Sequence, residues 1–240
     1  MQKAYIWFKR GSIVLAILGL IGLIAFMMLT HQAMDEASTR IEHDNVYKED
    51  NVIIVEAEDP IANLVFYPGA LVESEAYLVM AEMLSIEGIT VYIVEMPLNL
   101  SILNPDAFDT IYDTYPSDLP WYLGGHSLGG AMTSRNDMEQ IDGLILVAAY
   151  IDVAHDLSNE TIDVLSITAS EDEVLDRVSF EEAKPYLPEG TIYREIEGGN
   201  HANFAYYGLQ RNDGDNTISR ETQHQIYTQY MIDFVKGDLS

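Results

Sequence analysis

The chain has 240 residues, of which 48% are hydrophobic, enough for one globular domain with a substantial core. Its formal net charge of −27 repels phosphate groups, so nucleic acid and anionic lipid surfaces are poor partners for such a domain. The absence of cysteine excludes disulfides, thiolate metal sites and cysteine nucleophiles.

The first predicted element is a transmembrane helix. Residues 11–30 (GSIVLAILGLIGLIAFMMLT) are uncharged, and a run of this length crosses the hydrocarbon core of a membrane. Basic side chains within residues 1–10 precede it, which predicts a short cytoplasmic N-terminus and a single-pass cell-membrane protein whose remainder lies outside the cytoplasm. The alternative is a cleaved signal peptide and a secreted protein. His31 and Asp35 stand where cleavage prefers small side chains, which favours the anchor.

A polar segment follows the anchor. Residues 31–50 carry many charged side chains and show little periodicity, which predicts a juxtamembrane spacer with at most a helical turn or two. Regular alternation of apolar runs and helical patterns begins after it. The globular domain is therefore predicted to span residues 51–240.

Strands and helices are predicted to alternate through this domain. Short apolar runs predict strands at residues 52–55, 64–67, 90–94, 121–123, 144–148, 164–168 and 193–196. Amphipathic patterns predict helices at residues 74–86, 106–112, 128–138, 180–186 and 219–237. Strands that are apolar on both faces and separated by helices indicate an α/β fold with a mainly parallel sheet.

One serine lies among glycines where a predicted strand meets a helix. Residues 125–129, GHSLG, match the pattern G-x-S-x-G. A nucleophile at such a corner has a strained backbone and needs small neighbours two residues away on either side. Its place at the carboxyl edge of the sheet and at a helix N-terminus favours developing negative charge. Ser127 is therefore the candidate nucleophile, and His126, the variable residue of the pattern, is expected to face away from it.

A serine nucleophile needs a general base, and the base needs an orienting acid. Of the six histidines, His201 follows the last predicted strand on a glycine-rich loop, EGGNHANF, and is the candidate base. Asp172 follows the preceding strand and is the candidate acid. Other acids near the ends of these strands remain alternatives: Asp152, Glu171, Glu173 and Asp176.

An oxyanion hole requires two backbone N–H groups. Leu128, directly after the nucleophile, is one candidate donor. The turn after strand 64–67 is shaped by Pro68-Gly69, and here Ala70 is the candidate donor and Leu71 the alternative. A plain Pro-Gly turn at the end of a strand is the competing interpretation.

Several segments together resemble the α/β-hydrolases, in particular a compact bacterial group of dienelactone-hydrolase-like proteins. They are YPGALVESEAY, YIVEMPLNLSILNPDAFD, GGHSLGGAM, LSITASEDEVLD and IEGGNHANFAYYG. The resemblance covers nearly all of residues 51–236 and excludes the anchor. It implies a Ser-Asp-His hydrolase of ester-type acyl bonds, and the chain order Ser127, Asp172, His201 agrees with that fold. Serine in place of the cysteine of dienelactone hydrolases argues against dienelactone activity.

The same resemblance implies an open site without a large cap domain, because only thirteen residues, 151–163, occupy the usual place of a cap. Leu71 and Phe204, with Tyr206 and Tyr207, are expected to line an acyl pocket. The sequence has no phosphate-binding loop, dinucleotide fingerprint or H-E-x-x-H pair, so no cofactor or metal is expected.

The predicted function is therefore a membrane-anchored serine hydrolase, a carboxylesterase that forms an acyl-enzyme from small-molecule acyl esters. An acyltransferase using the same three residues is one alternative. The other is a hydrolase-fold binding module at the cell surface without turnover, since a fold alone does not establish activity.

Overall fold

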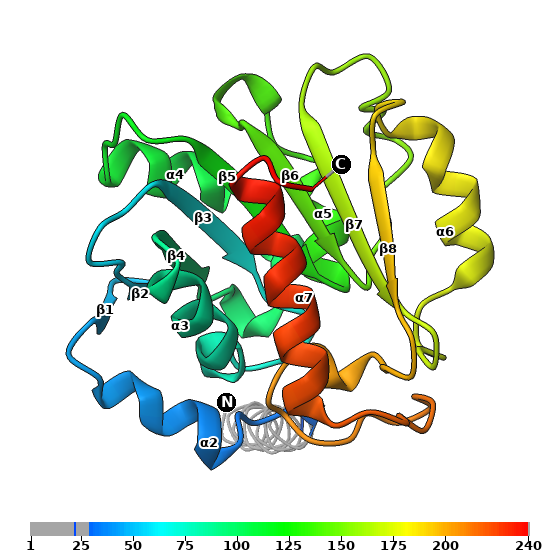
Figure 1. Ribbon diagram of the computed structural model, residues 1–240, viewed down its shortest axis with the longest axis horizontal. Helices are drawn as coiled ribbons and strands as arrows, with labels where there is room; N and C mark the ends of the chain where they lie inside the picture. Colours follow the sequence, from blue (N-terminus) through cyan, green and yellow to red (C-terminus); the bar gives the residue numbers. More distant parts are fainter. Residues whose placement is uncertain (1–21, 23–28, 240) are drawn as a thin grey trace, which may run out of the picture. The chain divides into compact units, whose positions relative to one another are not determined.

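The computed structural model describes residue 22 and residues 29–239 (Figure 1). Almost all of the predicted anchor, residues 11–30, lies outside the described residues. Within the part that is described, no helix is both long and apolar enough to cross a membrane. The chain divides into two units, residues 1–31 and 32–240, and the fold below is that of the second unit.

An eight-stranded sheet forms the centre of this unit, with the order β1-β2-β4-β3-β5-β6-β7-β8 (Figure 1). β1 pairs antiparallel with β2 and β2 antiparallel with β4, whereas every pairing from β4 across to β8 is parallel. The strands are β1 (Val46–Glu49), β2 (Val52–Val55), β3 (Ala62–Tyr67), β4 (Ile89–Val94), β5 (Trp121–His126), β6 (Gly143–Val147), β7 (Asp163–Ala169) and β8 (Ile192–Ile196). The predicted α/β class and mainly parallel sheet are confirmed.

Helices cover both faces of the sheet, which is why its central strands are apolar on both sides. β2, β3, β4 and β6 are buried along their whole lengths. One apolar cluster packs the sheet against α3 (Leu78–Ile86) and α7 (Arg220–Val235), which lie over the near face in Figure 1. The other cluster packs it against α4 (Ala107–Thr114), α5 (Leu128–Thr133) and α6 (Arg177–Ala183).

The sheet order reverses at β3, which lies between β4 and β5. β4 pairs with one side of β3, and β5 pairs with its other side. Because the three strands are parallel, the loops after β3 and β5 start at the same carboxyl edge of the sheet and then run in opposite directions along it. Ligands of open α/β sheets bind at such a switch point, beyond the carboxyl ends of the strands. The fold thus brings the turn after Tyr67 next to the corner at Ser127.

The segment predicted as a spacer is folded onto the domain. α2 (Asp35–Ser38) is followed by a 3₁₀ turn, Thr39–Glu42, and by β1. Ala37 is fully buried, and the N–H of Met34 donates to the carbonyl of Tyr206 at 2.8 Å. Glu82 of α3, only 8% exposed, pairs with both Arg40 and His43. The compact unit therefore begins at Gln32, because charged side chains that looked solvated have partners on a helix distant in sequence.

His224 of α7 is buried between the rings of Tyr206 and Tyr227, whose centroids lie 4.7 and 5.0 Å away. Burial, reinforced by the positive charges of Arg220 and Arg40, lowers the pKa of His224 from 6.5 to about 3. Between pH 6.5 and about 3, His224 is therefore protonated in the unfolded chain and neutral in the folded chain.

We expect the free energy of unfolding to fall on acidification by about 1.4 kcal/mol per pH unit from this residue alone, between pH 6.5 and about 3. Urea titrations of the wild type and His224→Gln at several pH values give the free energy of unfolding at each pH, and its slope against pH is compared between the two proteins. His155→Gln is the control, because His155 is exposed in the folded state. Equal slopes for the wild type and His224→Gln would contradict the expectation.

Candidate active site

Ser127 occupies a sharp corner between β5 and α5. Its backbone has φ 53° and ψ −122°, a left-handed conformation that strains a residue other than glycine. Two hydrogen bonds hold the corner: the Ser127 N–H donates to the carbonyl of Val147 at 2.9 Å, and the Ala131 N–H donates to the carbonyl of Ser127 at 3.0 Å. The corner leaves Ser127 partly exposed at the carboxyl edge of the sheet.

The two glycines that flank the serine stand where neighbouring backbone leaves no room for a side chain. A Cβ at Gly129 would lie 2.1 Å from the carbonyl oxygen of Tyr67 and 2.5 Å from that of Pro68. A Cβ at Gly125 would lie 2.5 Å from the backbone of Gly129 itself. This crowding is the physical reason for the spacing G-x-S-x-G in this chain, and it puts α5 in direct contact with the turn after β3.

Asp172 and His201 form a buried pair beside this corner. The Nδ1 atom of His201 lies 2.8 Å from Oδ2 of Asp172, and the two side chains are 2% and 0% exposed. The other carboxylate oxygen, Oδ1, accepts from the N–H groups of Val174 and Leu175 at 2.9 and 2.8 Å. Because the carboxylate accepts at Nδ1, the proton of a neutral His201 is on that nitrogen, which leaves Nε2 as the acceptor required of a general base.

The alternative acids have other roles or face solvent. Asp176 caps α6 by accepting from the N–H groups of Val178 and Ser179. Asp152 pairs with Arg135 at 2.8 Å, and Glu173 is exposed. Of the five acids proposed from the sequence, Asp172 is the one bonded to the ring of His201.

Two side chains that the sequence did not single out hold the loop of His201. Gln223 of α7 accepts from the N–H of Asn200 at 3.0 Å and donates to its carbonyl at 2.8 Å. Asp213 accepts from the N–H groups of His201 and Ala202 at 3.1 and 2.7 Å. Neither residue belongs to a recognisable motif, because the side chain of each bonds only to backbone groups, and those of the His201 loop lie 11 to 23 residues away in sequence.

The two candidate oxyanion donors lie on the adjoining turns. The N–H of Leu71, the alternative, donates to the carbonyl of Asn99 at 2.7 Å and is therefore occupied. Neither Ala70 nor Leu128 has an acceptor for its N–H group among the residues that the structure describes. Both are partly exposed. The geometry therefore favours Ala70 over Leu71 as the partner of Leu128.

A cavity of about 250 Å³ opens at Ser127 and His201. Its other lining residues are mostly small or apolar: Leu128, Ala131, Ala148, Ala149, Tyr150, Val174, Leu175 and Asp176. They come from α5 and from the loops after β6 and β7. Apart from Leu128, which belongs to the G-x-S-x-G segment, none of them is part of a motif, and only their position after the strands could have indicated that they line a cavity.

The predicted pocket residues lie elsewhere. Phe204 is 1% exposed and packs in the core against the rings of Tyr227 and His126, with centroids 5.4 and 5.8 Å away. Leu71 is partly exposed but does not line the cavity. Tyr206 and Tyr207 are each 6% exposed. The chain after His201 turns into the core through a short 3₁₀ segment, Ala202–Phe204, so these aromatic rings face inward.

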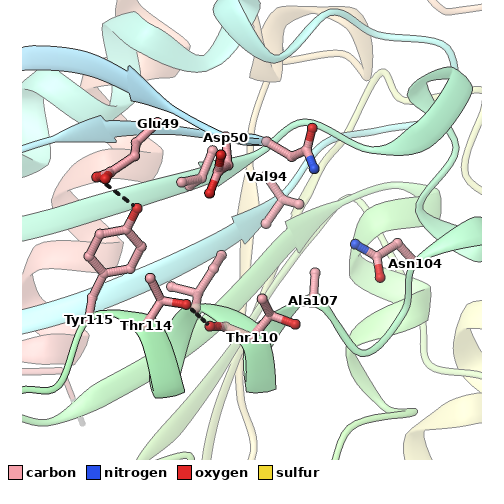
Figure 2. A pocket seen from close by; sticks show the side chains of 11 residues that line it. Glu49, Asp50, Val94, Asn104, Ala107, Thr110, Thr114 and Tyr115 are labelled. Atoms are coloured by element: carbon pink, nitrogen blue, oxygen red, sulfur yellow. Dashed lines mark hydrogen bonds between the residues drawn. The ribbon is translucent and has the colours of Figure 1, made fainter.

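A second cavity, of about 430 Å³, lies between the β1–β2 turn and α4 (Figure 2). Its lining mixes polar and apolar side chains, and the hydroxyl of Tyr115 donates to Glu49 at 3.1 Å across one side. It shares no residue with the cavity at Ser127 and has no pairing of a nucleophile with a base. Over the described residues, no group of three or more His, Asp or Glu side chains is placed to hold a metal ion.

Comparison with solved structures shows that hydrolases share the fold of this chain. An esterase from the Planctomycetes species Thermogutta terrifontis is 13% identical, with a TM-score of 0.54 over 79% of this chain and 88% of its own. The dienelactone hydrolase of Anabaena variabilis is 14% identical, with a TM-score of 0.54 over 75% and 90%. Acyl-protein thioesterase 2 of Zea mays is 11% identical, with a TM-score of 0.56 over 78% and 100%.

No curated protein matches the chain in sequence. The family described as the alpha/beta hydrolase family, in contrast, matches residues 63–225, from β3 into α7 and through all three candidate residues. With a match over well more than half of its length, and with the fold shared by the three structures above, the chain belongs to the alpha/beta hydrolase family.

Proposed function

We propose that this chain is a serine hydrolase that cleaves carboxylic ester-type acyl bonds through Ser127, His201 and Asp172. One observation carries the proposal: His201, bonded to the buried Asp172, lines the same cavity as a serine in a strained corner. A histidine oriented by a carboxylate beside a serine is the arrangement that activates a hydroxyl as a nucleophile.

The reaction follows from these positions. Oγ of Ser127 attacks the acyl carbon while Nε2 of His201 takes the hydroxyl proton, and Asp172 stabilises the resulting imidazolium without accepting the proton. The N–H groups of Ala70 and Leu128 bind the oxyanion. His201 returns the proton to the departing alkoxide, which leaves as the alcohol. Water, activated by the same histidine, then releases the acid from the acyl-enzyme and regenerates Ser127.

The cavity and the charge indicate the substrate class. A lining of alanines and aliphatic side chains suits a short acyl chain, and the volume of about 250 Å³ limits its length. The net charge of −27 repels anionic substrates and so favours neutral esters. The esterase and the acyl-protein thioesterase among the similar folds support acyl transfer to water.

Residues 11–30 support the further proposal that the enzyme is anchored in the cell membrane, with its domain outside the cytoplasm. A cleaved segment would instead yield a secreted enzyme with the same site.

Fluorophosphonate labelling tests the nucleophile. The full-length wild type is expected to react covalently, Ser127→Ala not at all, and His201→Ala at least about 100-fold more slowly, because the general base is lost. Ser158→Ala, which removes an exposed serine, is the control and should label normally. A folded wild type that does not label would favour the binding module without turnover, and labelling of Ser127→Ala would identify another nucleophile.

Narrowing the cavity should shorten the acyl chains that the enzyme accepts. We expect Ala131→Leu to lower kcat/KM for p-nitrophenyl hexanoate more than 10-fold while that for the acetate stays within about threefold, since each methylene excluded from an apolar pocket is worth about 1–3 kcal/mol. Ala154→Leu, at an exposed position, is the matched control. An unchanged preference would place the acyl group elsewhere.

The acyltransferase alternative is tested by adding alcohols to the same reaction. Conversion of these alcohols to esters would show acyl transfer to an acceptor other than water.

The lack of native cysteine makes membrane topology directly measurable. A membrane-impermeant maleimide is expected to label Asp238→Cys in intact cells and Lys3→Cys only after lysis. Labelling of both variants only after lysis would contradict the prediction that the domain lies outside the cytoplasm. Recovery of the protein in the medium, without its first residues, would show cleavage.

A further inference from the structure

We propose that His126 and Tyr77 form a buried positioning pair that orders the oxyanion turn and supports His201, so that the variable residue of G-x-S-x-G contributes to activity without touching substrate. The inference rests on the proposed function, because it concerns the same site. His126 ends β5 and Tyr77 ends a 3₁₀ segment before α3, Ser74–Tyr77. The exposed fractions of the two side chains are 1% and 0%.

Tyr77 connects the two parts of the site through its hydroxyl. The Gly69 N–H donates to this hydroxyl at 2.9 Å, and the hydroxyl lies 2.9 Å from Nδ1 of His126. If His126 also donated, the hydroxyl proton would have no acceptor among the described residues. That tautomer would leave both the hydroxyl proton and Nε2 of His126 unpaired, whereas donation from Tyr77 to Nδ1 leaves only Nε2 without a partner among the described residues. The Tyr77 hydroxyl therefore donates to Nδ1, and the single ring proton of His126 is on Nε2.

Both groups of the pair remain uncharged. Burial, followed by the neighbouring His201, lowers the pKa of His126 well below 6.5. Burial also raises the pKa of Tyr77, so its hydroxyl keeps the proton that it donates. A neutral His126 adds no repulsion when His201 becomes an imidazolium during the reaction.

At one end, the pair restrains the oxyanion turn. A Cβ at Gly69 would lie 3.0 Å from Nδ1 of His126 and 3.2 Å from the Tyr77 hydroxyl, so the pair packs directly against this backbone. Gly69 precedes Ala70, the candidate oxyanion donor, and the hydrogen bond to Tyr77 limits rotation of the peptide just before it. An oxyanion hole is effective when its donors are oriented before the charge develops.

At the other end, the ring of His126 supports the base. Its centroid lies 4.6 Å from that of His201, at an interplanar angle of 40°. The ring of Phe204 packs on His126 from another side, with centroids 5.8 Å apart. His201 thus has Asp172 at its Nδ1 and His126 against its ring. One continuous set of contacts joins the oxyanion turn to the general base.

Steady-state kinetics of the full-length protein with p-nitrophenyl acetate test the pair. We expect Tyr77→Phe and His126→Phe each to lower kcat 10- to 100-fold with little change in KM, because only binding of the transition state is weakened. His126→Asn, whose Oδ1 can replace Nδ1 as acceptor, should recover kcat to within about fivefold of wild type. The double variant Tyr77→Phe/His126→Phe should be no slower than the worse single variant, because the pair acts as one unit.

Tyr227→Phe is the matched control for loss of a buried hydroxyl, since Tyr227 is also fully buried and donates to the carbonyl of Phe204 at 3.0 Å. It should lower stability but leave kcat within about threefold. Wild-type kcat in Tyr77→Phe or in His126→Phe would overturn the proposal, as would an equal loss in Tyr227→Phe or additive losses in the double variant.

Amide hydrogen exchange separates this proposal from the proposed function. The Gly69 amide should exchange at least 10-fold faster in Tyr77→Phe and in His126→Phe than in the wild type and Tyr227→Phe. A wild type that neither labels with fluorophosphonate nor hydrolyses the ester would overturn the proposed function, and Gly69 exchange would still decide whether the pair orders the turn. Unchanged Gly69 exchange in both variants would overturn the pair, even in an active enzyme.

Discussion

The candidate site depends on direct contact between two backbone turns. Helix α5 starts so close to the end of β3 that a side-chain carbon at Gly129 would lie 2.1 Å from the Tyr67 carbonyl oxygen. This contact fixes the distance between the two candidate oxyanion donors, Ala70 and Leu128, one on each turn. It also holds Ser127 in a backbone conformation that an isolated corner would relax. The positions of the candidate nucleophile and of the candidate oxyanion donors are therefore consequences of one packing constraint.

Around this contact, the buried side chains of Asp172 and Gln223 have hydrogen-bond partners that give each a defined orientation. Asp172 uses one carboxylate oxygen for His201 and the other for two N–H groups of its own loop. Gln223 fixes the backbone of Asn200, next to the histidine, from the far helix. A conformation that left one of these buried groups without a partner would cost about 1–3 kcal/mol and is therefore disfavoured. The result is a candidate base held in one orientation beside a small, mostly apolar cavity.

The strong negative charge of the chain has little part in this chemistry. The acids near the site other than Asp172 have ordinary structural roles, as a helix cap at Asp176 and an ion pair at Asp152. Glu82 joins α3 to the N-terminal segment through Arg40 and His43. Most of the remaining charge is a property of the surface, where it favours solubility and disfavours anionic substrates.

The sequence by itself determined the local features of this protein. Short apolar runs located seven of the strands and helical periodicity located the main helices, and their alternation defined the α/β class. The glycines around Ser127 and the places of Asp172 and His201 after their strands identified the candidate residues, because strand ends in a parallel sheet share one edge. The strand 121–123 was predicted too short, since the glycines that continue β5 to His126 resemble a turn.

Only the tertiary structure decided what depends on contacts between distant segments. It favours Asp172 among five candidate acids, because this carboxylate is bonded to His201, and Ala70 over Leu71, because the N–H of Leu71 is occupied by the carbonyl of Asn99. It turned Phe204 into the core and lined the cavity with alanines that have no sequence signature. It folded residues 32–49 onto the domain through partners on α3. Such contacts join residues tens of positions apart, and local periodicity carries no information about them.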